Sequence, residues 1–297
     1  MNPPVNHTAR FGLIDVAPVF AAHGVRSRRW TVRPGLALAA VFVLFLLIAA
    51  FQPALLVSGD PLQASAREAF RAPDSLYWLG TDENGRDILT RLVYAVRPSL
   101  VLGVSATAIG LLVGTVFGLA AGLGPRWLDG AVMRTVDVLL AFPDLLLALV
   151  IITFFGQGQL NLILAVGIAS VPRYARLVRA QTLGVRSAGY VEAATTLGLS
   201  RAAVIVRHIL PNAIKPVLIL ATIGIGGNIV NGAALSFLGF GAPPPAPEWG
   251  GMLAMGRNYL ANAGWLVAWP ALAITLTVVS ISAIGRELLR RSEGKRP

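Results

Sequence analysis

The chain has no cysteine and little charge of either sign. Of its 297 residues, 13% are Asp, Glu, Lys or Arg, whereas about 25% is usual in a soluble domain. Without cysteine, neither a disulfide nor a thiolate metal site can form. Hydrophobic residues make up 55% of the chain, and the mean hydropathy is +0.69. This composition is that of an integral membrane protein.

Lysine and histidine are also scarce, which limits the chemistry that the chain can perform. The two lysines, Lys215 and Lys295, are followed by proline and arginine. Neither therefore ends a glycine-rich loop of the kind that holds nucleotide phosphates. The three histidines lie outside every long apolar run, and no His-Glu-x-x-His motif occurs. We expect no catalytic residue, no metal site and no cofactor on this chain.

What the sequence does contain is a series of long apolar runs. A run of about 20 apolar residues is long enough to cross a bilayer as a helix. The runs predict an all-α, polytopic membrane protein with six membrane-spanning helices. A cleaved signal peptide is the alternative for the first run, which is longer than the usual stretch of about 7–15 residues. The predicted spans are 35–57, 100–123, 135–155, 160–183, 211–232 and 266–285.

The net charge of +11 is distributed unevenly. Most of the 25 basic residues lie in the two tails, 1–34 and 286–297, or near 124–134 and 173–215, whereas acids and bases nearly balance in 58–97. Cytoplasmic loops of membrane proteins carry an excess of Lys and Arg. The pattern predicts two cytoplasmic termini and an extracytoplasmic 58–97 segment. It is better explained by a membrane than by nucleic acid.

The segment 58–97 contains one predicted helix. Apolar residues recur at helical spacing across 82–96, and Thr81 is a suitable N-cap. We expect this amphipathic helix to lie along the outer membrane interface. Asp87 and Arg91 would then stand one turn apart and form an ion pair.

Glycine recurs every fourth residue in the second predicted span. This spacing puts the glycines on one helix face, where a neighbouring helix can approach closely. We interpret the face as a helix-packing seam, with lining of a substrate path as the alternative. Its members are Gly110, Gly114, Gly118 and Gly122.

The third predicted span, 135–155, contains two carboxylates and a proline. Pro143 should kink the helix. Asp137 lies near the inner end, where it can pair with Arg134. Asp144 lies deeper, where an ionisable side chain usually faces protein or water. We expect Asp144 to line a path, to pair across a subunit interface, or to occupy an ordinary solvated position.

Polar side chains also occur in the fourth and fifth predicted spans. Arg173, Arg176 and Arg179 share one face of a helix near its inner end, where they can extend toward water or face a partner. Asn228 and Asn231 lie in the outer half of the fifth span. Amide side chains at such positions suit helix packing or a polar lining, so both are candidates for a translocation path or a subunit interface.

A basic segment between the fourth and fifth spans carries the most specific motif. Ser187 can cap a short helix, Gly198 can end it, and Pro211 can start the next helix. The segment is therefore predicted to form a helix-turn-helix knob facing the cytoplasm. The motif residues are Glu192, Ala193, Ala194, Gly198, Leu210 and Pro211.

The spacing of this motif resembles the cytoplasmic EAA loop of ABC-importer permeases. The stretches 80–87, 235–239 and 247–250 add to the resemblance, which is to the second permease of dipeptide, oligopeptide and nickel importers. It implies a type I ABC-importer permease fold. The permease core would cover 98–285 and include a coupling loop at about 184–211.

The resemblance also implies a function and a set of partners. The six motif residues would couple the chain to an ATPase, and the chain itself would be no enzyme. ATP and Mg²⁺ would be bound by two separate ATP-binding cassette subunits. The other implied partners are a second homologous permease, an extracytoplasmic substrate-binding protein and the lipid bilayer, but no nucleic acid. The implied location is the cell (inner) membrane of a bacterium or an archaeon.

The substrate is the least constrained part of this prediction. A nickel path would require imidazole or thiolate ligands, yet no predicted span contains histidine or cysteine. We therefore favour short peptides over nickel or another small solute. Outside transport, the alternatives are a membrane-embedded enzyme, which would need catalytic residues on different spans, and a channel, which would need a selectivity filter. Residues 285–290 and Gly232 depart from common family sequences, so the subfamily stays open.

Overall fold

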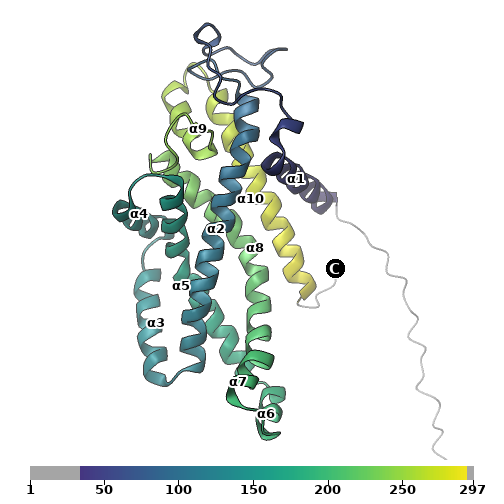
Figure 1. Cartoon of the computed structure of the whole chain (residues 1–297), viewed down its shortest axis with the longest axis vertical. Coiled ribbons are helices and arrows are strands. Elements are labelled where there is room, and N and C mark those ends of the chain that lie inside the picture. The colour runs from purple at the N-terminus through teal and green to yellow at the C-terminus, as the bar shows by residue number, and fades with distance from the viewer. Residues whose placement is uncertain (1–33, 293–297) are drawn as a thin grey trace, which may run out of the picture. The chain divides into compact units, whose positions relative to one another are not determined.

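The computed structural model describes residues 34–292, which are almost entirely helical (Figure 1). Within this range the only β-type pairing is an isolated bridge between Thr81 and Asp87, so the predicted all-α fold is confirmed. The predicted tail at 1–34 lies outside the described residues except for Pro34, as does 293–297 of the C-terminal tail. The elements are α1 (Pro34–Phe51), η1 (Pro53–Leu55), η2 (Ala66–Glu68), α2 (Ile88–Leu123), α3 (Arg126–Leu140), α4 (Asp144–Phe155), α5 (Gln159–Arg186), α6 (Gly189–Thr196), α7 (Arg201–Val204), η3 (Ile205–Ile209), α8 (Leu210–Phe237), α9 (Trp249–Gly256), η4 (Arg257–Tyr259) and α10 (Trp265–Ser292).

Five helical stretches between residues 34 and 292 are long and apolar enough to cross a membrane. They are α1, α2, α5, the continuous run from α7 through α8, and α10. The pair α3 and α4 passes the same test only when the two helices are taken together, and they meet at a bend of 97°. If the bent pair is one span, the number is six, as the sequence predicts.

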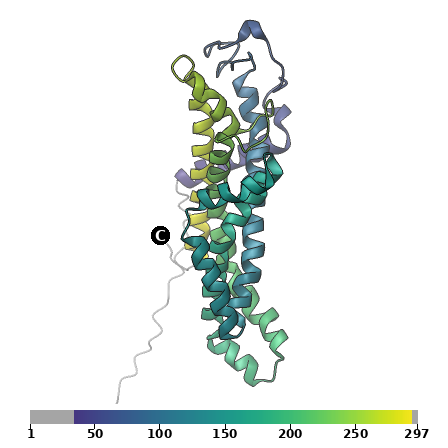
Figure 2. The ribbon, with the colours of Figure 1, turned by 90° about the vertical axis from the view of Figure 1, so that its left-hand side faces the viewer.

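The third predicted span is broken rather than kinked, which corrects the helix expected over 135–155. α3 ends at Leu140 and α4 begins at Asp144. Pro143 has no backbone N–H to donate, and it disfavours helical geometry in Phe142 before it. Because both constraints fall in one short stretch, the chain changes direction and α4 leaves the line of α3 (Figures 1 and 2).

α2 is the helix around which the others pack. It has 36 residues and is therefore about 54 Å long, and α5 lies against it over much of its length (Figure 2). A Cβ added at Gly118 would lie 2.6 Å from the carbonyl oxygen of Ala175, closer than any real side chain approaches. The two helices can be this close only because the facing residues are glycine. The residues that face α5 in this way are Gly110, Gly114, Gly118 and Gly122.

The start of α2 differs from the amphipathic helix predicted at 82–96. α2 begins at Ile88, and its N-cap is Asp87, whose carboxylate accepts hydrogen bonds from two backbone N–H groups of the first turn. Thr81, the predicted cap, lies in the preceding loop, where its hydroxyl donates to the backbone carbonyl of Glu68. The N-cap therefore lies six residues later in the chain than predicted.

The helix that starts there is not a separate interfacial helix. α2 continues through Pro98 to its last residue without a break, so the predicted amphipathic helix and the second predicted span are one element. The predicted ion pair between Asp87 and Arg91 is also wrong. The oxygens of Asp87 serve the cap, and the Nε atom of Arg91 instead lies 3.5 Å from Oδ2 of Asp82.

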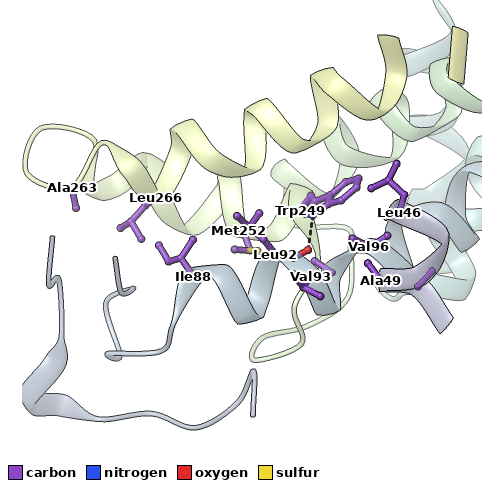
Figure 3. Close-up of a cluster of buried hydrophobic side chains, with 12 residues drawn as sticks. Leu46, Ala49, Ile88, Leu92, Val93, Val96, Trp249, Met252, Ala263 and Leu266 are labelled. Atoms are coloured by element: carbon purple, nitrogen blue, oxygen red, sulfur yellow. Dashed lines mark hydrogen bonds between the residues drawn. The ribbon is translucent and has the colours of Figure 1, made fainter. Parts of the chain in front are cut away.

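A buried hydrophobic cluster joins α1, α2, α9 and α10 near the start of α2 (Figure 3). Leu46 comes from α1, Leu92 and Val96 come from α2, and Leu266 comes from α10. The side chain of Trp249, on α9, is 1% exposed, and its indole N–H donates to the backbone carbonyl of Leu92 at 3.2 Å. This cluster holds the short helix α9 against the long helices.

Candidate coupling segment and ion-pair stripe

The predicted EAA motif lies in a projecting part of the chain between α5 and α8, which we call the coupling segment (residues 184–211). It consists of the end of α5, the short helix α6, a turn, and then α7 and η3, which run directly into α8. Figure 1 shows α6 and α7 at the end of the molecule that is remote from α9. The predicted knob is therefore present, although two of its boundaries differ.

α6 has one face turned inward and one face left exposed. The exposed face carries Glu192 and Ala193, and the next turn adds Leu197, which is 81% exposed. Ala194 is buried, so it serves the folding of the segment, whereas the exposed residues are available to another protein. The inward face forms a small apolar cluster of Val191, Ala194, Val204 and Ile209.

Gly198 ends α6 in the left-handed conformation, with φ = +83°. Its N–H donates to the backbone carbonyl of Thr195 at 3.0 Å, which closes the last turn. A Cβ at this position would meet nothing within 4 Å. The backbone conformation, and not a lack of space, is therefore what requires glycine here.

The predicted start of α6 is wrong. The N-cap of α6 is Ala188, which has no side chain that can accept a hydrogen bond. Ser187 instead belongs to the end of α5, where its hydroxyl donates to the backbone carbonyl oxygens of Leu183 and Gly184. No side chain therefore caps the start of α6.

Pro211 is the second residue of α8, as predicted, but the helical run does not begin there, which corrects the other boundary. The helix begins ten residues earlier, after the N-cap Ser200, and passes through the π-helical turn η3 before Pro211. A proline ring inside an α-helix presses on the carbonyl four residues earlier, here that of Arg207. In η3 the N–H of Leu210 bonds to the carbonyl of Ile205, five residues back. This wider turn accommodates the proline, and such turns are frequent at functional sites.

Two arginines tie the coupling segment to the end of α2. Arg186 donates to the carbonyl of Gly122, and Arg201 donates to the carbonyl of Leu123, both at 3.0 Å. The last carbonyls of a helix have no partner within it and carry partial negative charge. Each guanidinium therefore satisfies an acceptor and complements the helix dipole. Beside these contacts lies a hollow of about 870 Å³, whose lining includes Glu192.

Three arginines on one face of α5 pair with three aspartates of the bent pair α3–α4. The Arg179 guanidinium donates to both carboxylate oxygens of Asp129, at 2.5 and 2.6 Å. The predicted pair of Asp137 with Arg134 is wrong, because α5 brings Arg176 to the same carboxylate. We call the set the ion-pair stripe: Arg173–Asp144, Arg176–Asp137 and Arg179–Asp129.

Asp144 occupies the first position of α4, directly after the break in the helix. The positive end of the α4 dipole stabilises its negative charge, and its ion pair is formed within this chain with Arg173. The pair is not enclosed by the chain, since the two side chains are 29% and 47% exposed.

The two candidate asparagines lie in different surroundings. Asn228 is 2% exposed, and its amide donates to the hydroxyl of Thr107 at 2.9 Å, which joins α8 to α2. Asn228 is therefore enclosed within this chain, and the expectation that it lines a path or a subunit interface does not fit its position. Asn231 is partly exposed, and its role stays a prediction.

A buried ionic cluster at the start of α2 was not predicted from the sequence. Arg86 pairs with Asp82 at 2.6 Å, and both side chains are almost fully buried. Arg91 is 2% exposed and donates to the backbone carbonyls of Pro61 and Pro245, at 2.9 and 3.2 Å. Two loops distant in sequence are thus joined through one guanidinium. The only sequence signal was the Gly-Thr-Asp-x-x-Gly-Arg-Asp stretch, whose charges are too closely spaced to suggest burial.

A buried carboxylate lies at the start of α9. Glu248 is 4% exposed and caps α9, where it accepts hydrogen bonds from the N–H groups of Gly250 and Gly251 at 2.9 Å each. Burial raises the pKa of the Glu248 carboxyl above its ordinary value of 4.5, and the hydrogen bonds offset only part of that effect.

We expect the substitution Glu248→Gln to remove one pH-dependent part of the stability. A carboxyl whose folded pKa is raised contributes stability that is present below its unfolded pKa and is lost as the pH rises through the folded value. Above pH 4.5, the thermal unfolding midpoint of the unsubstituted protein should therefore fall relative to that of the Glu248→Gln protein. Parallel curves of midpoint against pH would contradict this assignment.

Comparison with known proteins assigns the chain to a family. Residues 114–294, more than half of the chain, match the family described as "Binding-protein-dependent transport system inner membrane component". The chain belongs to this family. It is accordingly a transport component, a permease of the ABC-importer kind, as the EAA motif indicated. The enzyme and channel alternatives are thereby set aside.

Curated relatives of the permease are named as permeases of peptide transport systems. A dipeptide transport system permease protein, DppC, of Alkalihalophilus pseudofirmus is 41% identical over 241 residues, which cover 81% of this chain and 79% of the relative. A glutathione transport system permease protein, GsiD, of Pectobacterium atrosepticum is 36% identical over 288 residues, 95% of this chain and 96% of the relative. The probable D,D-dipeptide transport system permease protein DdpC of Escherichia coli is 37% identical over 259 residues, 86% of this chain and 87% of the relative.

Solved structures show the fold of the permease. A chain in the crystal structure of an amino acid ABC transporter with histidines matches with a TM-score of 0.55 at 20% identity, over 68% of this chain and 94% of that one. A chain of the MetNI methionine ABC transporter in an inward-facing conformation matches with a TM-score of 0.57 at 19% identity, over 68% of this chain and 95% of that one. The predicted type I permease fold is confirmed. The roles of the individual coupling residues stay predictions.

Proposed function

We propose that this permease and a second, homologous permease enclose the path of an ATP-driven importer of short peptides. The names of the relatives support the substrate class. The coupling segment is the observation that carries the proposal. It projects from the long helices, leaves Glu192 and Ala193 exposed on one face of α6, and has its turn fixed by Gly198.

In this proposal, the energy comes from two separate ATP-binding cassette subunits, which bind ATP and Mg²⁺. The chain has no glycine-rich loop ending in Lys-Ser or Lys-Thr, so another polypeptide must hold the nucleotide. The exposed face of α6 docks against an ATPase, and Glu192 lies in the first turn, where a carboxylate complements the helix dipole. A substrate-binding protein delivers the peptide on the other side of the membrane.

We propose the cell (inner) membrane of a bacterium or archaeon as the location, with both termini and the coupling segment in the cytoplasm. A reporter that works only in the cytoplasm should then be active when fused after Arg296 or inserted after Arg201. It should be inactive when inserted near Ala246, in the loop before α9 and away from the coupling segment (Figure 1). The excess of basic residues in the first two regions is the reason. Activity at Ala246 would overturn the orientation.

The proposed function is tested by reconstitution. The permease, its fellow permease, the two ATPases and the binding protein are produced together and placed in lipid vesicles. We expect ATP-dependent uptake of a labelled dipeptide, and no uptake when this chain is omitted. Stimulation of ATP hydrolysis by Ni²⁺ but not by peptide would instead favour a nickel importer, the other substrate class considered from the sequence.

A further inference from the structure

We propose that the Arg173–Asp144 pair lines the water-filled path of the importer and holds the two charged ends of a short peptide. Arg173 would take the terminal carboxylate, and Asp144 would take the terminal ammonium group. This assignment rests on the proposed function, because it assumes that the transported solute is a short zwitterionic peptide.

The position of the pair within the spans is the first argument. Arg173 is halfway along α5, about 20 Å from each end, and Asp144 lies at the break between α3 and α4. Ionisable groups at such depth are costly against lipid and almost always face protein or a water-filled cavity. Since nearly half of the Arg173 side chain is exposed, the surface that carries the pair is not a lipid-facing surface.

A hollow beside Arg173 is the second argument. It has a volume of about 440 Å³, lies between α5, α8 and α10, and is lined in part by Arg173, Tyr174 and Ser282. Sites for small molecules typically have volumes of about 300–1,000 Å³. Gly227, on the α8 side, has open space where a Cβ would be. The hollow can therefore admit a small solute next to Arg173.

The chemistry of the pair is the third argument. Without substrate, the guanidinium and the carboxylate neutralise each other. A zwitterionic peptide brings one carboxylate and one ammonium group, so it can replace each partner while each side chain keeps one contact with an opposite charge. The planar guanidinium suits a carboxylate, and Asp144 lies at the N-terminus of α4, where the helix dipole favours negative charge. Recognition of the ends alone leaves the peptide side chains unrestricted.

The ion-pair stripe also contains a pair that can serve as a control. Arg179 and Asp129 join α5 to α3 in the same way, with two short contacts, and they are the least exposed pair of the three, at 31% and 27%. Unlike Arg173, Arg179 is not among the residues that line the hollow. Loss of this pair removes the same kind of contact between α5 and the bent pair α3–α4, at α3 instead of α4, without removing a proposed peptide contact.

The test uses the reconstituted importer with two double variants, Arg173→Gln/Asp144→Asn and Arg179→Gln/Asp129→Asn. At saturating peptide-loaded binding protein, the first should lower the rate of dipeptide uptake by about tenfold or more, as expected for the loss of charge-assisted contacts. ATP hydrolysis stimulated by the binding protein should continue. The control variant should keep uptake within about twofold. Both variants are compared at equal abundance in the vesicles.

A second measurement tests whether the surface that carries Arg173 is in contact with water. The chain has no cysteine, so Gly227→Cys provides a single thiol on this chain beside Arg173. We expect a charged, water-soluble thiol reagent to modify it, and peptide trapped in the complex to slow the modification.

Each outcome decides one part of the proposal. An unreactive thiol would mean that lipid or protein covers the surface, which overturns it. Unchanged uptake in the first double variant, or an equal loss in both, would show that the pair has no peptide-binding role. If the unsubstituted complex takes up no peptide, the proposed function and the peptide assignment both fail, whereas reactivity at Gly227→Cys would still establish a water-filled path.

Discussion

Replacing Gly198 with valine should abolish peptide uptake while the chain stays inserted and paired with its fellow permease. Gly198 has φ = +83°, a conformation that costs a β-branched residue about 1–3 kcal/mol. Because nothing lies within 4 Å of the added Cβ, the strain must change the path of the turn after α6 rather than the packing of the spans. Uptake and co-purification of the ATPases are the measurements.

The matched control is Gly184→Val. Gly184 is also exposed, also belongs to the coupling segment, and also has open space around its Cβ position, but it lies within α5 and has no positive φ. This variant should keep uptake near the unsubstituted rate. Normal uptake in Gly198→Val would mean that the turn does not transmit the motion of the ATPase.

Glu192→Lys tests the exposed face of α6 without straining the backbone. Between residues 34 and 292, the Glu192 carboxylate forms no ion pair. Reversal of its charge therefore costs the isolated permease only the dipole interaction, about 0.3–1 kcal/mol. We expect normal abundance and permease pairing, with weakened ATPase binding and loss of uptake. A large fall in abundance would instead assign Glu192 to folding.

Gly118→Leu should have the largest effect on stability. A Cβ at Gly118 would lie 2.6 Å from the backbone oxygen of Ala175 and 2.7 Å from the Cβ of Val178. A backbone atom cannot move aside as the end of a flexible side chain can, so α2 and α5 must separate. Overpacking in a core costs about 1–3 kcal/mol, and here the separation also disturbs neighbouring contacts along the seam. We expect a marked fall in abundance and in the thermal unfolding midpoint of the purified chain.

Gly130→Leu is the control for this substitution. Gly130 lies in α3, and an added Cβ there meets nothing within 4 Å. The same increase in size should therefore leave the unfolding midpoint nearly unchanged. Equal midpoints for Gly118→Leu and Gly130→Leu would contradict the close approach of α2 and α5.

The sequence predicted those features that depend on local periodicity. Glycine at every fourth position places four small residues on one helix face whatever the rest of the chain does, and α5 lies against that face. The positive φ of Gly198 has a similar origin, since a glycine just beyond a short helical pattern is the usual C-terminal signal. Long apolar runs likewise predicted the helices that are long enough to cross a membrane.

The start of α2 could not be predicted locally, because three residues of one stretch, Thr81, Asp82 and Asp87, are all good N-caps. Tertiary contacts decide among them. Asp82 is held by Arg86 in a buried pair, and the hydroxyl of Thr81 is bound by a backbone carbonyl, which leaves Asp87 for the helix. The burial of Arg91 has the same cause, since its acceptors come from loops far away in the sequence.

The ion-pair stripe could not be predicted from the sequence for a related reason. Nearest-neighbour rules paired Asp137 with Arg134, three residues away, whereas the structure pairs it with Arg176 on another helix. Only the close packing of α3 on α5 brings those two charges together. Pro211 shows the same limit, because a local rule places it at the start of a helix, but the π-helical turn before it lets the helix pass through.

The continuity of α2 has a mechanical consequence. One end of this helix receives the guanidinium groups of Arg186 and Arg201, and the other carries the indole contact of Trp249 and the buried Arg91. An unbroken helix of about 54 Å is stiff along its axis, whereas the α3–α4 pair has a corner of 97° in the middle. We therefore expect a displacement of the coupling segment to be transmitted along α2 to the opposite end of the helix, while α3 and α4 change their relative angle at the bend.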